Sequence, residues 1–208
     1  MNIVDIKFEQ LTNNSQLSND DLNNIAQLVY HTDPYIYPAL FDNSDNAKKI
    51  IPLLILNNDD MFKKENFFVA IYMHKIVGII LWKKGSISCD LKLYKKLFAQ
   101  YSIELPKNFY FTFDTYFSEY KNLNMQNISI LNVCIDKQYR GHRIGSLLMK
   151  CFLENHKKNN IELYVLKNNI NAINLYKKNG FKIISELNGF SVTKEKPICY
   201  KMLREKSR

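Results

Sequence analysis

One segment past the middle of the chain places a strand, a glycine-bearing turn and an amphipathic helix in direct succession. Residues 130–135 are mostly apolar, residues 138–145 contain Gly141 and Gly145, and apolar residues then recur at helical spacing. These apolar positions are Ile144, Leu147, Leu148, Cys151 and Phe152. Such a turn presents backbone N–H groups that lack intrahelical partners, at the helix end where the dipole favours negative charge. The segment therefore predicts a site for a phosphate or pyrophosphate.

A second segment repeats the strand-to-helix pattern. Residues 161–166 alternate as in a strand, Asn169 stands where a helix N-cap belongs, and the helix predicted after it ends at Asn179-Gly180. A further apolar strand begins at Phe181. The glycine spacing of the first segment does not fit the dinucleotide fingerprint G-x-G-x-x-G. The two segments together, and not the glycines alone, therefore carry the interpretation.

Taken together, the two segments resemble the GNAT superfamily of N-acetyltransferases. Residues 140–145, Arg-Gly-His-Arg-Ile-Gly, resemble the acyl-CoA turn of that family, commonly written Q/R-x-x-G-x-G/A. Residues 169–181 resemble its second motif nearly position by position. The resemblance is motif-specific over residues 128–203 and architectural before them. Arg143 replaces the middle glycine of the turn, so we expect it to take a helical conformation in the first helical turn.

The resemblance implies an α/β fold with a mixed, mostly antiparallel central sheet flanked by helices. We expect a single N-acetyltransferase domain over residues 1–208, with an acyl-CoA-binding core at about 128–203. Residues 85–126 interrupt the family pattern, which usually joins the third and fourth strands by a short link. Because so long a structureless loop is uncommon in a compact domain, we expect a helical or aromatic insertion before the fourth strand.

The first part of the chain carries ordinary strand and helix signals. Strands are predicted at residues 3–11, 67–72 and 75–82, the last two joined by a tight turn. A capping box at Ser18 begins one helix, and a second helix covers about residues 45–57 with a bend at Pro52. Pro34 and Pro38 favour an extended segment between the two helices.

The resemblance also implies which residues bind acetyl-CoA, the cosubstrate of the family. The fourth strand would contact the pantetheine arm, the turn would hold the pyrophosphate, and an asparagine would bond the CoA arm. The residues at these positions are Val133, Cys134, Ile135, Arg140, Gly141, His142, Arg143, Ile144, Gly145, Ser146 and Asn169. Tyr176 would protonate the CoA sulfur, because a phenol with a pKa near 10 is a proton donor at neutral pH. The structural alternatives are a helix N-cap for Asn169 and a core side chain for Tyr176.

The sequence leaves the general base open. Some members of the family use a glutamate on the strand before the CoA turn, but the polar side chain that this strand offers is the amide of Asn132. The alternatives are His31, Asp33, Asp114, Glu119 and a water-mediated relay. Cys134 is disfavoured as an acyl-carrying nucleophile, since no activating histidine lies near it in the sequence and the family transfers the acyl group directly. A small buried side chain is the preferred interpretation of Cys134.

The charge is unevenly distributed along the chain, which bears on the acceptor. Residues 1–60 hold three lysines against nine carboxylates, a net charge of −6. Because the whole chain carries +9, residues 61–208 carry +15. Family members usually wall the acceptor side with the first two helices and the loop between them. That loop here holds His31, Asp33, Tyr35 and Tyr37.

Carboxylates beside aromatic rings suit a cation. We therefore expect a small cationic amine acceptor, such as a polyamine, an amino sugar or a basic amino-acid derivative, with Tyr110, Tyr116 and Tyr120 of the insertion as a lid. The alternative is that these acids are solvated and these aromatic rings belong to the core. Two further alternatives are an acetyltransferase for a protein or RNA-associated substrate and a non-catalytic acyl-CoA-binding protein.

Composition excludes several other classes. A hydrophobic fraction of 46% with 13% aromatic residues excludes a disordered chain. No apolar run approaches the roughly 20 residues that cross a membrane, and the N-terminus lacks a secretory leader, so we expect a cytoplasmic protein. The four cysteines form no C-x-x-C pair and lack histidines at ligand spacing, so we expect reduced thiols and no metal. The basic part suits a polyphosphate cofactor, whereas no RNA- or DNA-binding signature is present, so we expect no nucleic acid. A homodimer is left open.

Overall fold

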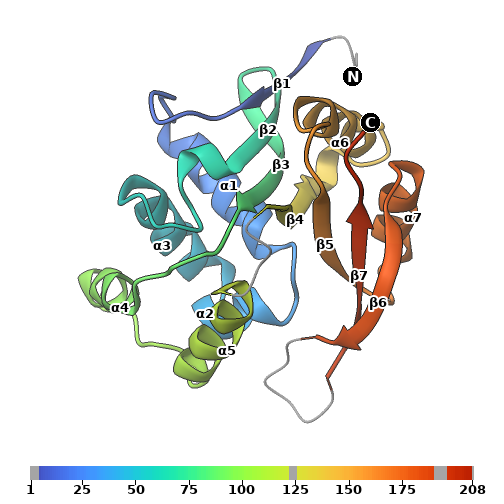
Figure 1. The fold of residues 1–208 in the computed structure, drawn as a ribbon. Helices are drawn as coiled ribbons and strands as arrows, with labels where there is room; N and C mark the ends of the chain where they lie inside the picture. The colour runs from blue at the N-terminus through green and yellow to red at the C-terminus, as the bar shows by residue number, and fades with distance from the viewer. Residues whose placement is uncertain (1–4, 122–125, 190–195, 208) are drawn as a thin grey trace.

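The computed structural model describes residues 5–121, 126–189 and 196–207, with the side chains of residues 119–121 outside that description (Figure 1). Its centre is a seven-stranded sheet in the order β1-β2-β3-β4-β5-β7-β6. The strands are β1 (Ile6–Gln10), β2 (Phe67–Tyr72), β3 (Lys75–Lys84), β4 (Ile128–Ile135), β5 (Ile161–Leu166), β6 (Lys182–Asn188) and β7 (Ile198–Arg204). β4 and β5 are parallel, and the other neighbouring pairs of this sheet are antiparallel. The predicted mixed, mostly antiparallel sheet is confirmed.

Helices cover both faces of this sheet, and each face has its own hydrophobic cluster. The helices are α1 (Asn19–Tyr30), α2 (Ile36–Phe41), α3 (Ser44–Leu56), α4 (Leu91–Gln100), α5 (Phe109–Lys121), α6 (Ile144–Asn155) and α7 (Ile170–Lys178), with short turns η2 (Lys64–Asn66) and η3 (Lys137–Tyr139). One cluster contains buried side chains of α1 to α5, and the other contains those of α6 and α7. Figure 1 shows α6 and α7 on the opposite side of the strands from α1 and α3. Among the described residues, no helix is both long and apolar enough to cross a membrane.

Local signals set the N-terminal elements as predicted. The Asp21 N–H donates to Ser18 Oγ at 3.1 Å, and the Ser18 N–H donates to Asp21 Oδ2 at 3.0 Å, which completes the capping box of α1. α3 spans the predicted second helix and contains Pro52. Met73 and His74 connect β2 to β3 with positive φ angles of 47° and 60°, the conformation of a tight type I′ hairpin turn.

The expectation of an extended segment through Pro38 is wrong, because α2 occupies part of it. Pro38 is the third residue of that helix, in the first turn, where a missing N–H leaves no intrahelical bond unmade. Asp33 also helps to begin α2. Its Oδ1 accepts hydrogen bonds from the N–H groups of Tyr35 at 2.7 Å and Ile36 at 2.9 Å. The carboxylate therefore satisfies two backbone donors at the helix start.

The insertion contains the helices α4 and α5, as the sequence predicted. The aromatic run beginning at Phe109 is helical, which places Phe109 and Phe113 on one buried face. Their rings pack against the α4 side chains, with ring centroids 5.5 Å apart for Phe98 and Phe109 and 5.1 Å apart for Tyr94 and Phe113. The Phe98 ring also stacks on Phe41 of α2 at 6.3 Å. The insertion is thus joined to α2 by aromatic packing.

Two adjacent carboxyl groups after α3 have pKa values that are shifted in opposite directions. Asp59 is 4% exposed, and burial raises its pKa to about 6 against the backbone hydrogen bonds from Met61 and Phe62. Asp60 is also partly desolvated, but hydrogen bonds from Lys83 and Lys63 lower its pKa to about 2. In the folded state Asp59 therefore binds a proton more tightly than in the unfolded chain, and Asp60 binds one less tightly.

We expect Asp59→Asn to stabilise the protein, because it keeps the Oδ1 acceptor and removes the buried charge. The gain should be about 1–2 kcal/mol above about pH 7 and should vanish as the pH falls toward 4, where wild-type Asp59 is protonated. Asp60→Asn, the matched control, should destabilise at neutral pH because it loses its lysine partners. Urea unfolding across that pH range measures both effects. A loss of stability in Asp59→Asn at neutral pH would contradict the assignment.

Candidate functional site

β4 and β5 separate soon after their pairing begins. Their parallel register covers residues 128–130 and 161–163, whereas β4 continues to Ile135 and β5 to Leu166. β4 also has one residue more than β3 at this point. Leu81 opposes Asn132 and Trp82 opposes Ile130, so that Leu131 has no partner across the ladder. Such a bulge bends its strand and increases the local twist. The edge of β4 beyond the bulge therefore faces a gap instead of a neighbouring strand.

A pocket of about 430 Å³ lies at this gap. Its walls combine β4, β5, α7, the α1–α2 junction, α5 and the β6–β7 end of the sheet. The lining residues from the strands β4 and β5 are Ile130, Leu131, Asn132, Val133, Tyr164, Val165 and Leu166. Those from the helical layers are Asn169, Ala172 and Tyr176 on one side and Thr32, Asp33, Tyr35, Ile36 and Tyr116 on the other. The pocket therefore connects the two sides of the sheet.

Tyr176 brings a protonated phenol to this pocket. Its side chain is 7% exposed and packs edge-on against Phe181, with ring centroids 5.8 Å apart. Burial raises the pKa of Tyr176 above the ordinary tyrosine value, since charge on the phenolate would be poorly solvated. The described part of the chain provides no hydrogen-bond partner for its hydroxyl. The group is therefore available to donate a proton into the pocket.

Asn169 caps α7 and lines the same pocket. Its Oδ1 accepts a hydrogen bond from the Ala172 N–H at 3.2 Å, so the predicted N-cap is confirmed. That bond uses the carbonyl oxygen, and the Nδ2 group can still donate to a ligand. The N-cap role and a ligand-binding role are therefore compatible in one side chain.

The turn before α6 takes a left-handed path at two positions. Gly141 has φ +81°, and Arg143 has φ +59° as the N-cap residue. The expected helical conformation of Arg143 is wrong: the arginine adopts the left-handed conformation that favours glycine, at the place where the family pattern has one. The N–H groups of the first helical turn, from Ile144 onward, still lack intrahelical acceptors. The geometry of an anion site is retained.

The Arg140 side chain folds back along β4. Its Nε donates to the Ile135 carbonyl at 3.0 Å, and its Nη2 lies 4.0 Å from Cys134 Sγ. Burial raises the pKa of Cys134 against the opposing charge of Arg140. The thiol is therefore protonated at neutral pH, which agrees with the predicted small buried role. Val133 lines the main pocket, whereas Cys134, Ile135 and Arg140 line a separate pocket of about 800 Å³ beside α1.

The four residues predicted to bind the acceptor do not all line the main pocket. Asp33 and Tyr35 line the main pocket, and burial raises the pKa of Asp33. His31 lines the separate pocket beside α1 instead. Tyr37 is fully buried and donates its hydroxyl hydrogen to Asn132 Oδ1 at 2.7 Å, so it supports the wall from behind.

Of the other candidate residues, Tyr116 lines the pocket, whereas Asp114 and Tyr110 are exposed and do not. The side chains of Glu119 and Tyr120 lie outside the described residues. Thr32 and Tyr164 were missed by the sequence analysis. An exposed position in the alternating pattern of β5 was the available signal for Tyr164, and no local signal marked Thr32.

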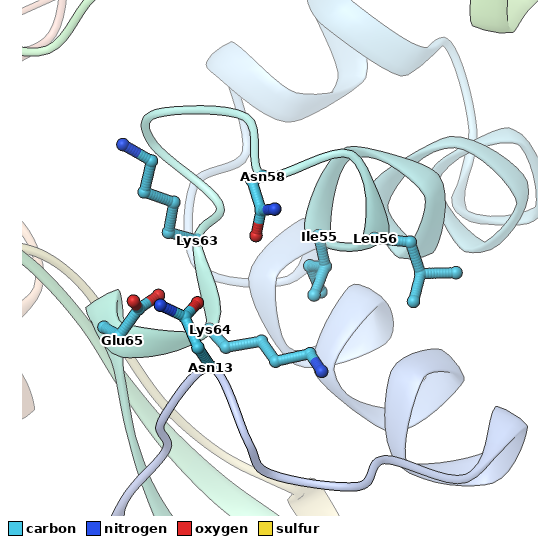
Figure 2. A pocket seen from close by; sticks show the side chains of 7 residues that line it. All are labelled: Asn13, Ile55, Leu56, Asn58, Lys63, Lys64 and Glu65. Atoms are coloured by element: carbon cyan, nitrogen blue, oxygen red, sulfur yellow. The ribbon is translucent and has the colours of Figure 1, made fainter.

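Another pocket, of about 510 Å³, lies at the end of α3 (Figure 2). Its lining residues are Asn13, Ile55, Leu56, Asn58, Lys63, Lys64 and Glu65. Lys63 and Lys64 extend in opposite directions there, so their ammonium groups do not converge on one ligand (Figure 2). None of the predicted site residues contributes to this pocket.

Comparison with known proteins agrees with this geometry. A family model described as an acetyltransferase (GNAT) domain matches residues 111–183, which include β4, the turn, α6, β5 and α7. This stretch of the chain is therefore similar to a GNAT acetyltransferase domain. The family uses acetyl-CoA as its acyl donor. A comparison with curated protein sequences finds no match.

Solved structures share the fold across nearly the whole chain. An N-acetyltransferase from Staphylococcus aureus Mu50 is 20% identical with a TM-score of 0.64, covering 95% of this chain and 99% of that one. The ribosomal-protein-S18-alanine N-acetyltransferase from Escherichia coli is 12% identical with a TM-score of 0.57, covering 98% and 95%. Arabidopsis thaliana Naa50, solved with the bisubstrate analogue CoA-Ac-MVNAL, is 18% identical with a TM-score of 0.54, covering 97% and 99%. At these identities the likeness establishes the fold that this chain shares with those acetyltransferases.

The turn before α6 can be tested at Gly145. A Cβ there would meet only Ile135 Cγ1, at 3.4 Å, so Gly145→Ala should fold and bind normally. A tryptophan side chain would lean toward the helix N-terminus and cover its N–H groups. Acetyl-CoA at about 100 times its Kd should raise the stability of the wild type and of Gly145→Ala by about 2.7 kcal/mol. Gly145→Trp should lose this gain in thermal unfolding, and an unchanged gain would exclude the turn as the phosphate site.

Proposed function

We propose that this GNAT protein transfers the acetyl group of acetyl-CoA directly to the primary amine of a small cationic molecule. One observation carries the proposal. A single pocket holds the Tyr176 phenol on the α7 side and the Asp33 carboxylate on the α2 side, with the free edge of β4 between them. The proton donor, the backbone that would hold the thioester and an anionic group for the amine thus share one space.

The donor would enter from the α7 side. Backbone groups of β4 beyond residue 130 face the gap and can bond the pantetheine amides, while the N–H groups at the start of α6 suit the pyrophosphate. Asn169 would donate from Nδ2 to the CoA arm. Val133 lines the wall of the pocket. This arrangement would bring the thioester sulfur toward Tyr176.

The chain supplies the two proton-handling groups that direct transfer requires. The amine nitrogen forms a bond to the thioester carbonyl carbon as the carbon–sulfur bond breaks, and Tyr176 donates its hydroxyl proton to the leaving thiolate. Asp33, directly or through one water, takes the proton that the amine loses. Its Oδ1 is committed to the N–H groups of Tyr35 and Ile36, so Oδ2 would face the amine. Transfer is complete without an acyl-enzyme.

Charge and volume support a small cation as the acceptor. Asp33 is the one charged residue among the described residues that line the pocket. Tyr35 and Tyr116 line the same space, and an aromatic face attracts a cation by roughly 0.5–2 kcal/mol. The volume of about 430 Å³ must also hold the end of the donor. A second ammonium or guanidinium group on a short acceptor would pair with Asp33.

Turnover across amines of different charge tests the acceptor class. We expect kcat/KM to be highest for agmatine or spermidine, lower for phenethylamine, and lowest for glutamate or a short peptide with a free N-terminus. Asp33→Asn keeps the Oδ1 cap of α2 and removes the charge. It should lower kcat/KM for every amine, because it removes the proton acceptor, and by a further factor of about 10–100 for the cationic amines, whose charge is left unpaired. Acetyl-CoA affinity should not change.

Equal rates for all amines, or a preference for the peptide, would overturn the cationic acceptor but leave the acetyltransferase assignment intact. A peptide preference would place this protein with neighbours such as Naa50, which was solved with a peptide-containing analogue.

Tyr176→Phe isolates the proton donor, because the ring keeps its packing against Phe181. Turnover should fall by about 10²–10⁴-fold, the usual contribution of a positioned acid. Acetyl-CoA binding, measured by calorimetry, should stay the same. Because burial raises the Tyr176 pKa, the wild-type rate should show no alkaline loss up to about pH 10. Normal turnover in Tyr176→Phe would assign the proton to another source.

A further inference from the structure

A buried hydrogen-bond chain connects the bulge of β4 to the wall that carries Asp33. Tyr37 Oη donates to Asn132 Oδ1 at 2.7 Å, and Asn132 Nδ2 donates to Thr32 Oγ1 at 2.6 Å. Thr32 Oγ1 in turn donates to the Val29 carbonyl, also at 2.6 Å. Asn132 is separated by 95 residues from Tyr37 and by 100 from Thr32, so the chain joins distant segments.

We propose that Asn132 is a positioning residue that holds the acceptor wall at a fixed place relative to the splayed strand β4. This inference rests on the proposed function. On the strand side, Asn132 directly follows Leu131, the unpaired residue of the bulge. On the wall side, Thr32 directly precedes Asp33, and Tyr37 lies in α2, whose first amides Asp33 caps. The Asn132 amide therefore links β4, the proposed donor strand, to the segment that carries Asp33, the proposed amine-binding carboxylate. It bonds Thr32 before Asp33 and Tyr37 after it.

Burial makes this connection costly to break. Asn132 is 5% exposed and Tyr37 is fully buried, so water does not readily replace a lost partner. Both ends of the amide are used, its oxygen by Tyr37 and its nitrogen by Thr32, which fixes the side chain in one orientation. An aliphatic side chain at this position would pack but would hold neither neighbour by a directed bond. The polar residue thus gives the junction a defined geometry.

Tyr37→Phe gives the sharpest test, because Tyr37 does not line the pocket and contacts no reacting group. The substitution keeps the ring and removes the donor to Asn132. Tyr94→Phe is the matched control: Tyr94 is also fully buried in the same hydrophobic cluster, and its hydroxyl interacts with Asp59, Cys89 and Tyr37 itself but not with Asn132. A second pair of variants changes the hydrogen bond between Asn132 and Thr32. Thr32→Val removes the acceptor for Nδ2, and Thr32→Ser restores a hydroxyl.

Two measurements separate this inference from the proposed function. Hydrogen exchange of the amides in residues 32–37 and 130–134 reports how firmly the junction is held, without any substrate. We expect faster exchange there in Tyr37→Phe and Thr32→Val, and wild-type exchange in Tyr94→Phe and Thr32→Ser. Steady-state kinetics with the best amine of the panel should show kcat/KM lowered about 10–100-fold in Tyr37→Phe and unchanged in Tyr94→Phe, since small displacements of reacting groups have effects of that size. Because Thr32 lines the pocket, its variants are compared by exchange alone. The Kd of acetyl-CoA should not change.

Each other outcome has a definite meaning. Unchanged exchange in Tyr37→Phe would overturn the positioning role, and so would faster exchange with wild-type kcat/KM. Equal losses of activity in Tyr37→Phe and Tyr94→Phe would also overturn it, because they would reflect stability alone. If the wild-type protein acetylates no amine, the proposed function fails, and the positioning role fails with it. Hydrogen exchange would then report only whether the Asn132 side chain stabilises the local structure.

Discussion

The separation of β4 from β5 is the constraint on which the rest of the site depends. Adjacent strands normally satisfy the hydrogen bonding of each other's backbone N–H and C=O groups. Groups left unpaired at a strand edge can bond another chain or a ligand. Here the pairing stops after residue 130, at the bulge residue Leu131. A ligand with regularly spaced amides, such as pantetheine, can take the place of the missing strand. The gap also opens the sheet to both helical layers, so that groups from opposite faces meet in one pocket.

Asp33 shows how one side chain can serve the fold and the proposed chemistry together. Its Oδ1 begins α2 through two backbone hydrogen bonds, which fixes the carboxylate on the pocket wall. Desolvation raises its pKa, while those same bonds lower it and so favour the charged form. A carboxylate held in this way keeps enough affinity for a proton to act as a base. It also remains a fixed counter-charge for a cation.

Much of the donor side was predictable from the sequence because its signals are local. The cap at Asn169 and the helical spacing after Ile144 each depend on residues a few positions apart. The conformation of Arg143 was not predictable in this way, since the turn as a whole imposes φ +59° on a residue that seldom adopts it. The acceptor side depended on tertiary contacts. His31 and Asp33 are two residues apart, yet the end of α1 turns them into different pockets.

The role of Tyr37 was also not predictable from local sequence, because it depends on tertiary contacts. Those contacts connect the Asn132 amide to the insertion. In the sequence Tyr37 is one of two tyrosines that closely follow Asp33, and nothing local distinguishes a residue that lines the pocket from one that supports its wall. In the structure its ring stacks on Phe41, Phe41 stacks on Phe98 of α4, and Phe98 packs against Phe109 of α5. This aromatic series runs from the buried amide of Asn132 to the insertion, which returns Tyr116 to the pocket. The insertion therefore contributes to the side of the pocket that holds Asp33, whereas the side that holds Tyr176 is lined by β4, β5 and α7.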